Sequence, residues 1–314
     1  PFANTSSANS GATTLHIMIS IIICTYNREA YIGKVLEALS RESYTDFETI
    51  VVDNKSTDST PLVIKDFQSS HPEFPLRILS EKKQGLSWAR NCGIRAAKGD
   101  LLVFLDDDAI PEEGYVERLA ENMKAHPQAG AFGGRIIPTF ESGEAPKWLC
   151  KWSLGWVSGL DMGQRVCYFE GRKFPIGANM GFRRSVLDAV GEFNPELGRN
   201  GGNLMGGEEK DLFNRVKAAG YGIVYLPDVC VRHMIPQSRT TVDYVRKFAD
   251  GVGKSERVRC KNEGSYPKRL LSEAVKWIAT IVLFFYYILT MRPSPAATLV
   301  LFRAHVTRSL LSGK

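Results

Sequence analysis

The chain has 314 residues, 44% of them hydrophobic, enough to bury the core of one large domain with or without an appendage. Its six cysteines are scattered without a Cys-x-x-Cys pair, which argues against a disulfide framework or zinc site and favours a reducing compartment. Residues 246–314 carry 13 Lys and Arg against 4 Asp and Glu, a net charge of +9, so the rest of the chain is near −3. We expect the basic tail to meet a negatively charged surface, either membrane phosphates or nucleic acid.

The amino-terminal half alternates between predicted strands and helices. Residues 1–14 are rich in Ser, Thr, Ala and Asn, so we expect a disordered lead-in without a signal peptide. The run LHIMISIIIC that follows is typical of a central parallel strand covered on both faces. Alternation of this kind predicts a parallel α/β sheet. The strands are expected over residues 15–24, 48–52, 76–80 and 101–105, and the helices over 29–40 and 86–97.

Three aspartates, Asp106, Asp107 and Asp108, directly follow the apolar strand 101–105. Desolvating even one unpaired carboxylate is costly, so these groups are either solvated or neutralised by a cation. The carboxyl ends of strands are where open α/β sheets bind ligands. A hard divalent cation that bridges to substrate phosphates fits this position, although a solvated acidic turn is the alternative.

Two other strands also end in polar residues, at Thr25–Arg28 and at Asp53-Asn54. Right-handed crossovers place such ends side by side along one edge of the sheet. We therefore expect one site assembled from three strand ends. Beyond it, the chain predicts a helix over 112–125, strands over 129–138, 176–182, 221–226 and 228–232, a Gly- and Asn-rich loop over 193–207 and a helix over 208–219.

The chain resembles family 2 glycosyltransferases, which are inverting enzymes with the GT-A fold that use a nucleotide-diphosphate sugar. The resemblance covers about residues 17–253 and rests on five motifs in order. They are ISIIICTYNR, ETIVVDNKSTD, GLSWARNCGIRAAKGDLLVFLDDD, GANMGFRR, and GGEEKDLFNRVKAAGY followed by VRHMIP. It implies a mixed, mainly parallel sheet flanked by helices, in a catalytic domain over residues 15–245 followed by a helical segment over 246–314.

The resemblance also implies roles for residues near the donor. Asp53 is expected to bind the nucleobase, a uracil or thymine imide, with Thr25, Tyr26 and Asn27 lining the same pocket. Arg28 and Arg90 are expected to reach the diphosphate, and the weaker alternative for Arg90 is an ordinary surface position on its helix. A few residues after His233, Arg239 is a further candidate for contact with the phosphates.

The family's Asp-x-Asp motif maps onto the aspartate triplet. Asp108 is then the expected ligand of Mn²⁺ or Mg²⁺, and Asp106 is expected to face the metal or the ribose. Asp107 is able to take the place of either of these two aspartates. His233 is expected to complete the metal shell, since imidazole is an acceptable ligand beside oxygen donors. The alternative for His233 is a surface position or a contact with the pyrophosphate.

The general base is expected in the motif GGEEKD, where the family usually carries Glu-Asp. This chain has Glu208-Glu209 instead, so Glu209 is the aligned base and Glu208 remains a competitor. Asp211 is expected to stabilise the helix amino terminus. Three tryptophans at four-residue spacing, Trp148, Trp152 and Trp156, are candidates for stacking on acceptor sugars, and packing into the core is the alternative.

The tail contains two apolar segments, residues 277–291 and 296–302, separated by Pro293 and Pro295. The first is short for a membrane span. We interpret residues 270–308 as a basic helical hairpin that lies on a membrane or re-enters it, with a dimerisation helix and a buried helix as alternatives. Nucleic acid is disfavoured as a partner because the basic charge accompanies long apolar runs.

Together these observations predict a cytoplasmic transferase at the inner face of the cell membrane, with a glycan or lipid-linked glycan as acceptor. Such an enzyme would act in the synthesis of bacterial cell-surface polysaccharide or glycolipid. A nucleotidyltransferase is a weaker alternative, since no Gly-rich phosphate loop with a lysine follows the first strand. A non-catalytic sugar- or nucleotide-binding scaffold of the same fold is the third possibility. The sequence leaves the sugar, the acceptor and the oligomeric state open.

Overall fold

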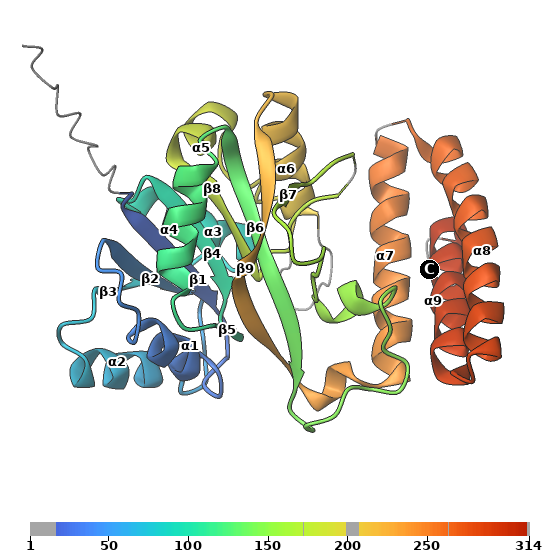
Figure 1. Ribbon diagram of the computed structural model, residues 1–314, viewed down its shortest axis with the longest axis horizontal. Coiled ribbons are helices and arrows are strands. Elements are labelled where there is room, and N and C mark those ends of the chain that lie inside the picture. The colour runs from blue at the N-terminus through green and yellow to red at the C-terminus, as the bar shows by residue number, and fades with distance from the viewer. Residues whose placement is uncertain (1–16, 172, 199–206, 263, 313–314) are drawn as a thin grey trace, which may run out of the picture.

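The structure is a computed structural model that describes residues 17–171, 173–198, 207–262 and 264–312. The lead-in expected for residues 1–14 lies outside the described residues. Figure 1 shows a sheet with helices on both faces and, beside it, three carboxyl-terminal helices. The predicted mixed, mainly parallel sheet flanked by helices is therefore confirmed.

The sheet has nine strands in the order β3-β2-β1-β4-β8-β6-β9-β5, with β7 paired to β9. Strands β1 to β4 are parallel to one another, whereas β8 is antiparallel to both β4 and β6. The strands are β1 Ile19–Thr25, β2 Phe47–Asp53, β3 Leu76–Ser80, β4 Leu101–Asp106, β5 Ala109–Pro111, β6 Ala129–Phe140, β7 Cys167–Tyr168, β8 Asn179–Arg183 and β9 Gly222–Ile235.

Alternating side chains of the central strands build a separate core on each face of the sheet. Ile19, Ile21 and Ile23 of β1 join the apolar side chains of helices α1, α2 and α4. Ile22 points the other way and packs with α3, α5 and α6. The helices of the sheet domain are α1 Ile32–Leu39, α2 Thr60–Ser70, α3 Leu86–Ala96, α4 Tyr115–Ala125, α5 Arg184–Val190 and α6 Glu208–Ala218, with short 3₁₀ turns at Leu154–Val157 and Gln237–Arg239.

One prediction about the sheet is wrong. The two short strands expected over 221–226 and 228–232 are a single long strand, β9, which pairs with β6. The register jumps between the pairs Gly134–Leu226 and Arg135–Cys230, so residues 227–229 bulge out of the ladder. Because the bulge accommodates Pro227, this residue does not end the strand as the sequence pattern indicates.

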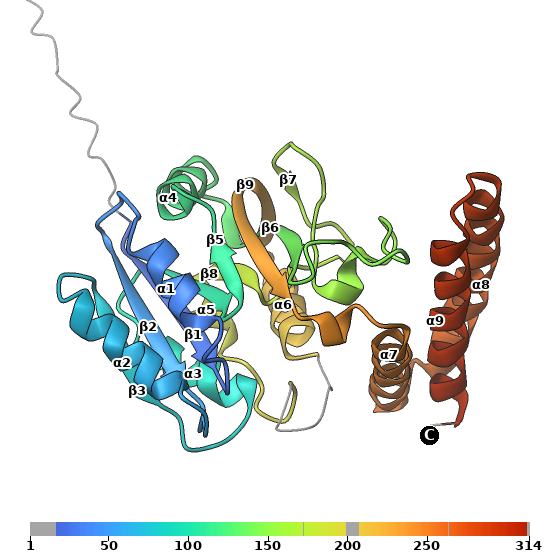
Figure 2. The ribbon, with the colours of Figure 1, turned by 90° about the horizontal axis from the view of Figure 1, so that it is seen from below.

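Three helices form the carboxyl-terminal part: α7 Val242–Asn262, α8 Tyr266–Leu289 and α9 Pro293–Ser312. The expected boundary after residue 245 falls inside α7. Figure 2 shows α9 and α8 side by side, with α7 nearest to the sheet domain. Helix α9 packs on α7 and contributes Phe302 and Val306 to a buried cluster with Trp156 of the sheet domain. The tail therefore contains the predicted hairpin, and α9 in addition matches the buried-helix alternative.

Candidate active site

The strand register brings the three polar motifs to one edge of the sheet. Thr25 pairs with Asp53 across β1 and β2, and Cys24 pairs with Asp106 across β1 and β4. The expectation that three strand ends lie side by side is confirmed. On the far side, β5 pairs Ala109 with His233 of β9, which places this histidine beside Asp108.

A cavity of about 410 Å³ opens at this edge. It is lined by most of the residues that the sequence predicts for the site: Thr25, Tyr26, Arg28, Arg90, Asp106, Asp107, Asp108, Glu208, Glu209, His233 and Arg239. These residues come from β1, β4, β9, α3 and α6 and from the loops that follow them. The fold thus gathers parts of the chain that are far apart in sequence around one space.

Two residues expected at the nucleobase, Asn27 and Asp53, do not line this cavity. They hold together the loops above the sheet edge instead. The Asp53 carboxylate accepts a hydrogen bond of 3.1 Å from the Ser56 backbone N–H, and the Asn27 side-chain oxygen accepts one of 2.8 Å from that of Thr57. Asn27 itself has a positive φ of 54°, a conformation that asparagine tolerates better than most residues.

The three tryptophans do not share one environment. Trp148 and Trp156 are buried at 3% and 8% exposure, and Trp156 stacks on Phe302 of α9. The Trp148 indole N–H donates to the Thr240 carbonyl at 2.7 Å. These two residues therefore fit the core-packing alternative and are not available for stacking on a sugar. Trp152 is 58% exposed and remains a candidate contact for the acceptor.

Asp106, Asp108 and His233 form a cluster with the composition of a metal site. Each offers one ligand atom, and these atoms all lie within 4.8 Å of one another. His233 Nε2 lies 2.9 Å from Asp108 Oδ1, and both side chains are almost completely buried. Burial opposes the charge of His233, but the hydrogen bond and charge of Asp108 outweigh it and raise the pKa of the imidazole. Two carboxylates and an imidazole are a donor set that can hold a divalent metal ion.

Arg28 neutralises part of this acidic cluster. Its Nε lies 3.4 Å from Asp107 and its Nη2 lies 3.7 Å from Asp108. Burial and the neighbouring Asp108 charge nevertheless raise the pKa of Asp107 to about 8. The cluster thus carries more acidic groups than Arg28 alone can balance, which favours the binding of a cation.

Buried Arg90 holds the two glutamates that compete as the general base. Its guanidinium lies 3.1 Å from Glu208 and 3.2 Å from Glu209, and a third acid, Asp106, is 4.0 Å away. Burial and the Glu208 charge raise the pKa of Glu209 to about 7, and the opposing charge of Arg90 does not cancel the effect. A carboxylate that titrates near neutral pH, inside a cavity, is well suited to act as a general base.

Two residues that shape the cavity were given no role of their own by sequence reasoning. Asn54 ties the end of β2 to the start of α3, because it donates to the Lys83 carbonyl at 2.8 Å and accepts from the Gly85 N–H at 2.8 Å. Gly177 lies against Glu209 and Arg90, where any Cβ would overlap both side chains. The Gly177 position in the motif GANMGFRR was the signal for this close approach.

The sheet and the polar edge define a glycosyltransferase of the GT-A fold. "Glycosyl transferase family 2" matches residues 20–191, more than half of the chain, and the chain belongs to this family. Among solved structures it is similar to the mannosyltransferase PcManGT from Pyrobaculum calidifontis in complex with GDP-Man and Mn²⁺. The TM-score is 0.63 at 18% identity, covering 96% of this chain and 89% of that one.

Two curated relatives align with this chain over about three quarters of their own length. The glucosyl-dolichyl phosphate glucuronosyltransferase of Haloferax volcanii is 25% identical over 241 residues, which are 75% of this chain and 76% of that protein. The succinoglycan biosynthesis protein ExoM of Rhizobium meliloti is 27% identical over 250 residues, which are 76% of this chain and 74% of that protein. The first relative is named for a glucosyl-dolichyl phosphate and the second for succinoglycan biosynthesis.

Proposed function

We propose that the protein is a metal-dependent, inverting glycosyltransferase that moves a sugar from a nucleotide-diphosphate donor to a hydroxyl of a lipid-linked acceptor. The observation that carries this proposal is the cavity itself. It places a carboxylate–imidazole cluster of metal-binding type and a carboxylate with a pKa near neutrality on the walls of one space. A transferase needs these two elements on opposite sides of the sugar that is transferred.

Asp106, Asp108 and His233 would hold Mn²⁺ or Mg²⁺. When bound, the metal supplies positive charge that stabilises the leaving nucleotide diphosphate. Arg28, which pairs with the same acidic cluster, is placed to contact the donor phosphates once the metal takes up the carboxylates. Tyr26 and Asn54, which line the cavity at the ends of β1 and β2 beside Asp53, would bind the base, and we favour UDP over dTDP or GDP as the nucleotide.

Glu209 would accept the proton of the acceptor hydroxyl as that hydroxyl attacks the anomeric carbon. Arg90 would hold the Glu209 carboxylate in place, since the two groups are 3.2 Å apart. Glu208 is more deeply buried and also accepts a hydrogen bond from the Gly207 N–H, which leaves it less free to meet a substrate. We therefore assign the base to Glu209 and a positioning role to Glu208.

Direct attack of this kind inverts the anomeric centre, which gives the proposal a stereochemical test. With an α-linked nucleotide sugar as donor, we expect a β-linked product. The anomeric coupling constant of the product in proton NMR distinguishes the two outcomes. An α-linked product from the same donor would exclude a single displacement with Glu209 as base.

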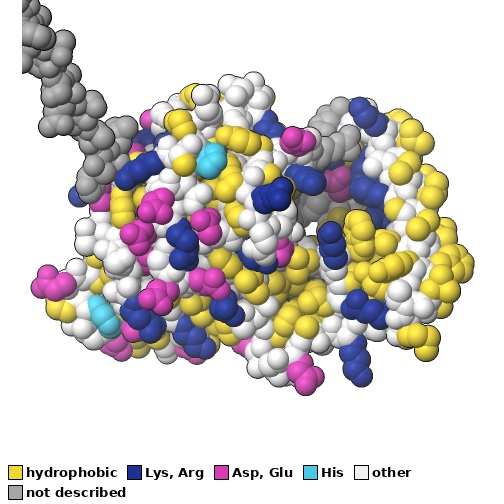
Figure 3. Space-filling model, viewed as in Figure 1, with side chains coloured by type: hydrophobic (Ala, Val, Ile, Leu, Met, Phe, Trp, Pro, Cys, Tyr) yellow, Lys and Arg dark blue, Asp and Glu magenta, His cyan; other side chains and the backbone are white. Residues whose placement is uncertain are grey.

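We further propose that α8 attaches the enzyme to the cytoplasmic face of a membrane. Among the described residues, α8 is the one helix long and apolar enough to cross a membrane, with a mean hydropathy of 1.5 in its most apolar window. Its outward stripe consists of Leu271, Val275, Ile278, Val282, Phe285 and Leu289. Figure 3 shows hydrophobic side chains along this outer edge of the molecule. Apolar side chains at these spacings form one exposed helix face, as in helices that lie in the membrane interface.

Charged substitutions on this stripe should release the enzyme from membranes. For the double variant Ile278→Glu and Val282→Glu, we expect affinity for vesicles with anionic lipid to fall by about a hundredfold. The reason is that two apolar side chains that would be buried in the membrane are replaced by charged ones. Leu62→Glu is the matched control, since Leu62 is 61% exposed on α2 of the sheet domain. Vesicle co-sedimentation measures the effect. Equal binding by the double variant, or a stable dimer of the wild type that the substitutions dissociate, would contradict the proposal.

A further inference from the structure

A second cavity lies between the sheet domain and the carboxyl-terminal helices. Its volume is about 620 Å³, and α6, α7, α8 and α9 all contribute to its wall. Figure 3 shows the molecule hollowed between these two parts, with Lys and Arg side chains around the opening.

Positive charge dominates the lining. Six cationic side chains reach the cavity wall: Lys210, Arg259, Lys268, Arg269, Lys276 and Arg303. Two carboxylates partly balance them, since Glu256 pairs with Arg269 at 2.9 Å and Glu273 pairs with Arg303 at 2.9 Å. Among the described residues, the cations at this cavity therefore outnumber the carboxylates. A concave site with this excess attracts a compact anion that carries about two negative charges.

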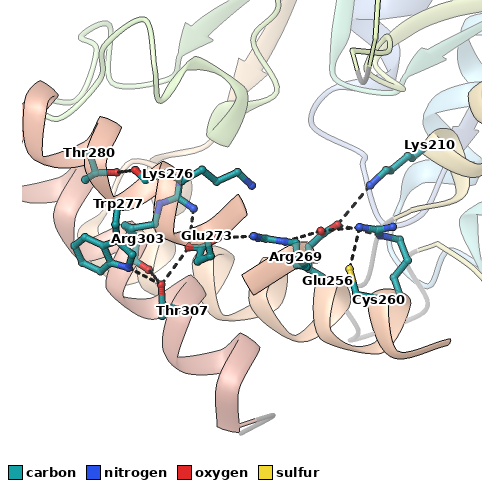
Figure 4. Close-up of polar contacts among 11 residues, drawn as sticks. Lys210, Glu256, Cys260, Arg269, Glu273, Lys276, Trp277, Thr280, Arg303 and Thr307 are labelled. Atoms are coloured by element: carbon teal, nitrogen blue, oxygen red, sulfur yellow. Dashed lines mark hydrogen bonds and ion pairs between the residues drawn. The ribbon is translucent and has the colours of Figure 1, made fainter. Parts of the chain in front are cut away.

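Two of the cations make no ion pair within the described part of the chain, namely Lys268 and Lys276 of α8. Burial and the neighbouring Arg269 charge lower the pKa of Lys276, as expected for an ammonium group in a positive field. Figure 4 shows Lys276 on α8 and Lys210 on the opposite side extending toward the space between them. Lys210 lies 3.5 Å from Glu256, which also binds Arg269, so these groups form one network across the cavity.

The cavity also borders the apolar face of α8. Lys268, Ser272 and Lys276 line it and follow one another at four-residue spacing, so they form a polar stripe on a single side of the helix. This stripe lies about 100° around the helix axis from the apolar stripe. A molecule with an apolar chain and an anionic head can therefore contact both stripes at once.

Helix α6 joins this cavity to the catalytic one. Glu208 and Glu209 line the catalytic cavity, whereas Lys210 and Asn214 line the second cavity. Lys210 directly follows the proposed base in α6, so an anion held beside Lys210 lies on a neighbouring face of the same helix turn. This arrangement suits an acceptor whose sugar enters the catalytic cavity while its phosphate stays outside.

We propose that the cavity between α6 and the carboxyl-terminal helices binds the phosphate or diphosphate group of the acceptor, with the lipid chain along the apolar stripe of α8. This inference rests on the proposed transferase function and names the chemical class of its acceptor. The name of the Haloferax volcanii relative includes a dolichyl phosphate, which is consistent with such an acceptor.

Binding of three probes tests the proposal: farnesyl diphosphate, farnesol and inorganic diphosphate, each measured by calorimetry on the full chain. The variant is Lys268→Gln with Lys276→Gln, because neither residue makes an ion pair on which folding would depend. Lys247→Gln with Lys254→Gln is the matched control, since both are exposed lysines of α7 that line neither cavity. We expect the variant to bind farnesyl diphosphate about tenfold more weakly than the wild type or the control.

The probes separate the possible sources of the anion. Equal weakening of inorganic diphosphate would support recognition of the phosphate whatever carries it, and weakening of farnesyl diphosphate alone would support a lipid-borne phosphate. Unchanged affinity of the variant for both anions, or equal affinity of the wild type for farnesol and farnesyl diphosphate, would overturn the proposal. These binding measurements require no turnover. They therefore test the anion site independently of whether the protein transfers a sugar.

Discussion

Replacing Glu209 by Gln is expected to lower kcat for sugar transfer by about a thousandfold, with donor affinity unchanged within about twofold. Glutamine has nearly the same shape and can still accept a hydrogen bond from Arg90, but it cannot take up a proton. Steady-state kinetics and nucleotide binding by calorimetry measure the two effects separately. Asp211→Asn is the control, because Asp211 lies in the same first turn of α6 and pairs with Arg215.

The pH dependence of the wild type provides an independent check on this assignment. Burial and the Glu208 charge raise the pKa of Glu209 to about 7. The base is protonated below this pKa, so kcat should fall about tenfold for each pH unit below it. Glu208→Gln removes a charge that raises the pKa and should shift this limb to lower pH. A Glu208→Gln variant that loses turnover while Glu209→Gln keeps it would show that Glu208 is the base.

Replacing Asp108 by Asn is expected to weaken metal binding by at least about a hundredfold, more than the loss of an outer-shell partner usually costs. Asparagine keeps the size of the side chain but loses the negative charge that His233 and a metal would share. Turnover should fall together with metal affinity, because the charge that stabilises the leaving diphosphate is then missing. Electron paramagnetic resonance of Mn²⁺ titrations measures the affinity directly.

Asp100→Asn is the matched control for this variant. Asp100 immediately precedes β4, at the end opposite to the acidic cluster, and its carboxylate accepts a hydrogen bond from the Met18 N–H. This substitution removes the same charge from a position away from the cavity, so Mn²⁺ binding should be unchanged. Equal Mn²⁺ affinity in Asp108→Asn and the wild type would place the metal elsewhere.

The sequence alone predicts those parts of the site that lie at strand ends. The run 101–105 predicts a buried strand, and carboxylates at its exit then lie at the carboxyl edge of the sheet. Parallel pairing of β1 with β2 and β4 then aligned Thr25, Asp53 and Asp106 without any knowledge of side-chain contacts. Local patterns carry this information because strand order follows from a few topological rules.

Local sequence patterns do not predict which side chains pair when they lie far apart in the sequence. Nothing in the spacing of Arg90 indicates that it lies between Glu208 and Glu209, which are more than 100 residues away. The four-residue spacing of Trp148, Trp152 and Trp156 fitted sugar stacking and core packing equally well. The stacking of Trp156 on Phe302 shows that Trp156 packs into the core. This contact forms because α9 packs against the sheet domain, which the local sequence around Trp156 does not indicate.

The most direct measurement for this account is nucleotide release by the wild type and Asp108→Asn from UDP-, dTDP- and GDP-sugars. Each donor would be supplied with Mn²⁺, with Mg²⁺ and with EDTA, in the presence of a membrane extract as acceptor. We predict metal-dependent release from one class of donor, absent with EDTA and in the variant. Equal release with EDTA, or undiminished release by Asp108→Asn, would contradict a metal-dependent transferase whose centre is the aspartate–histidine cluster.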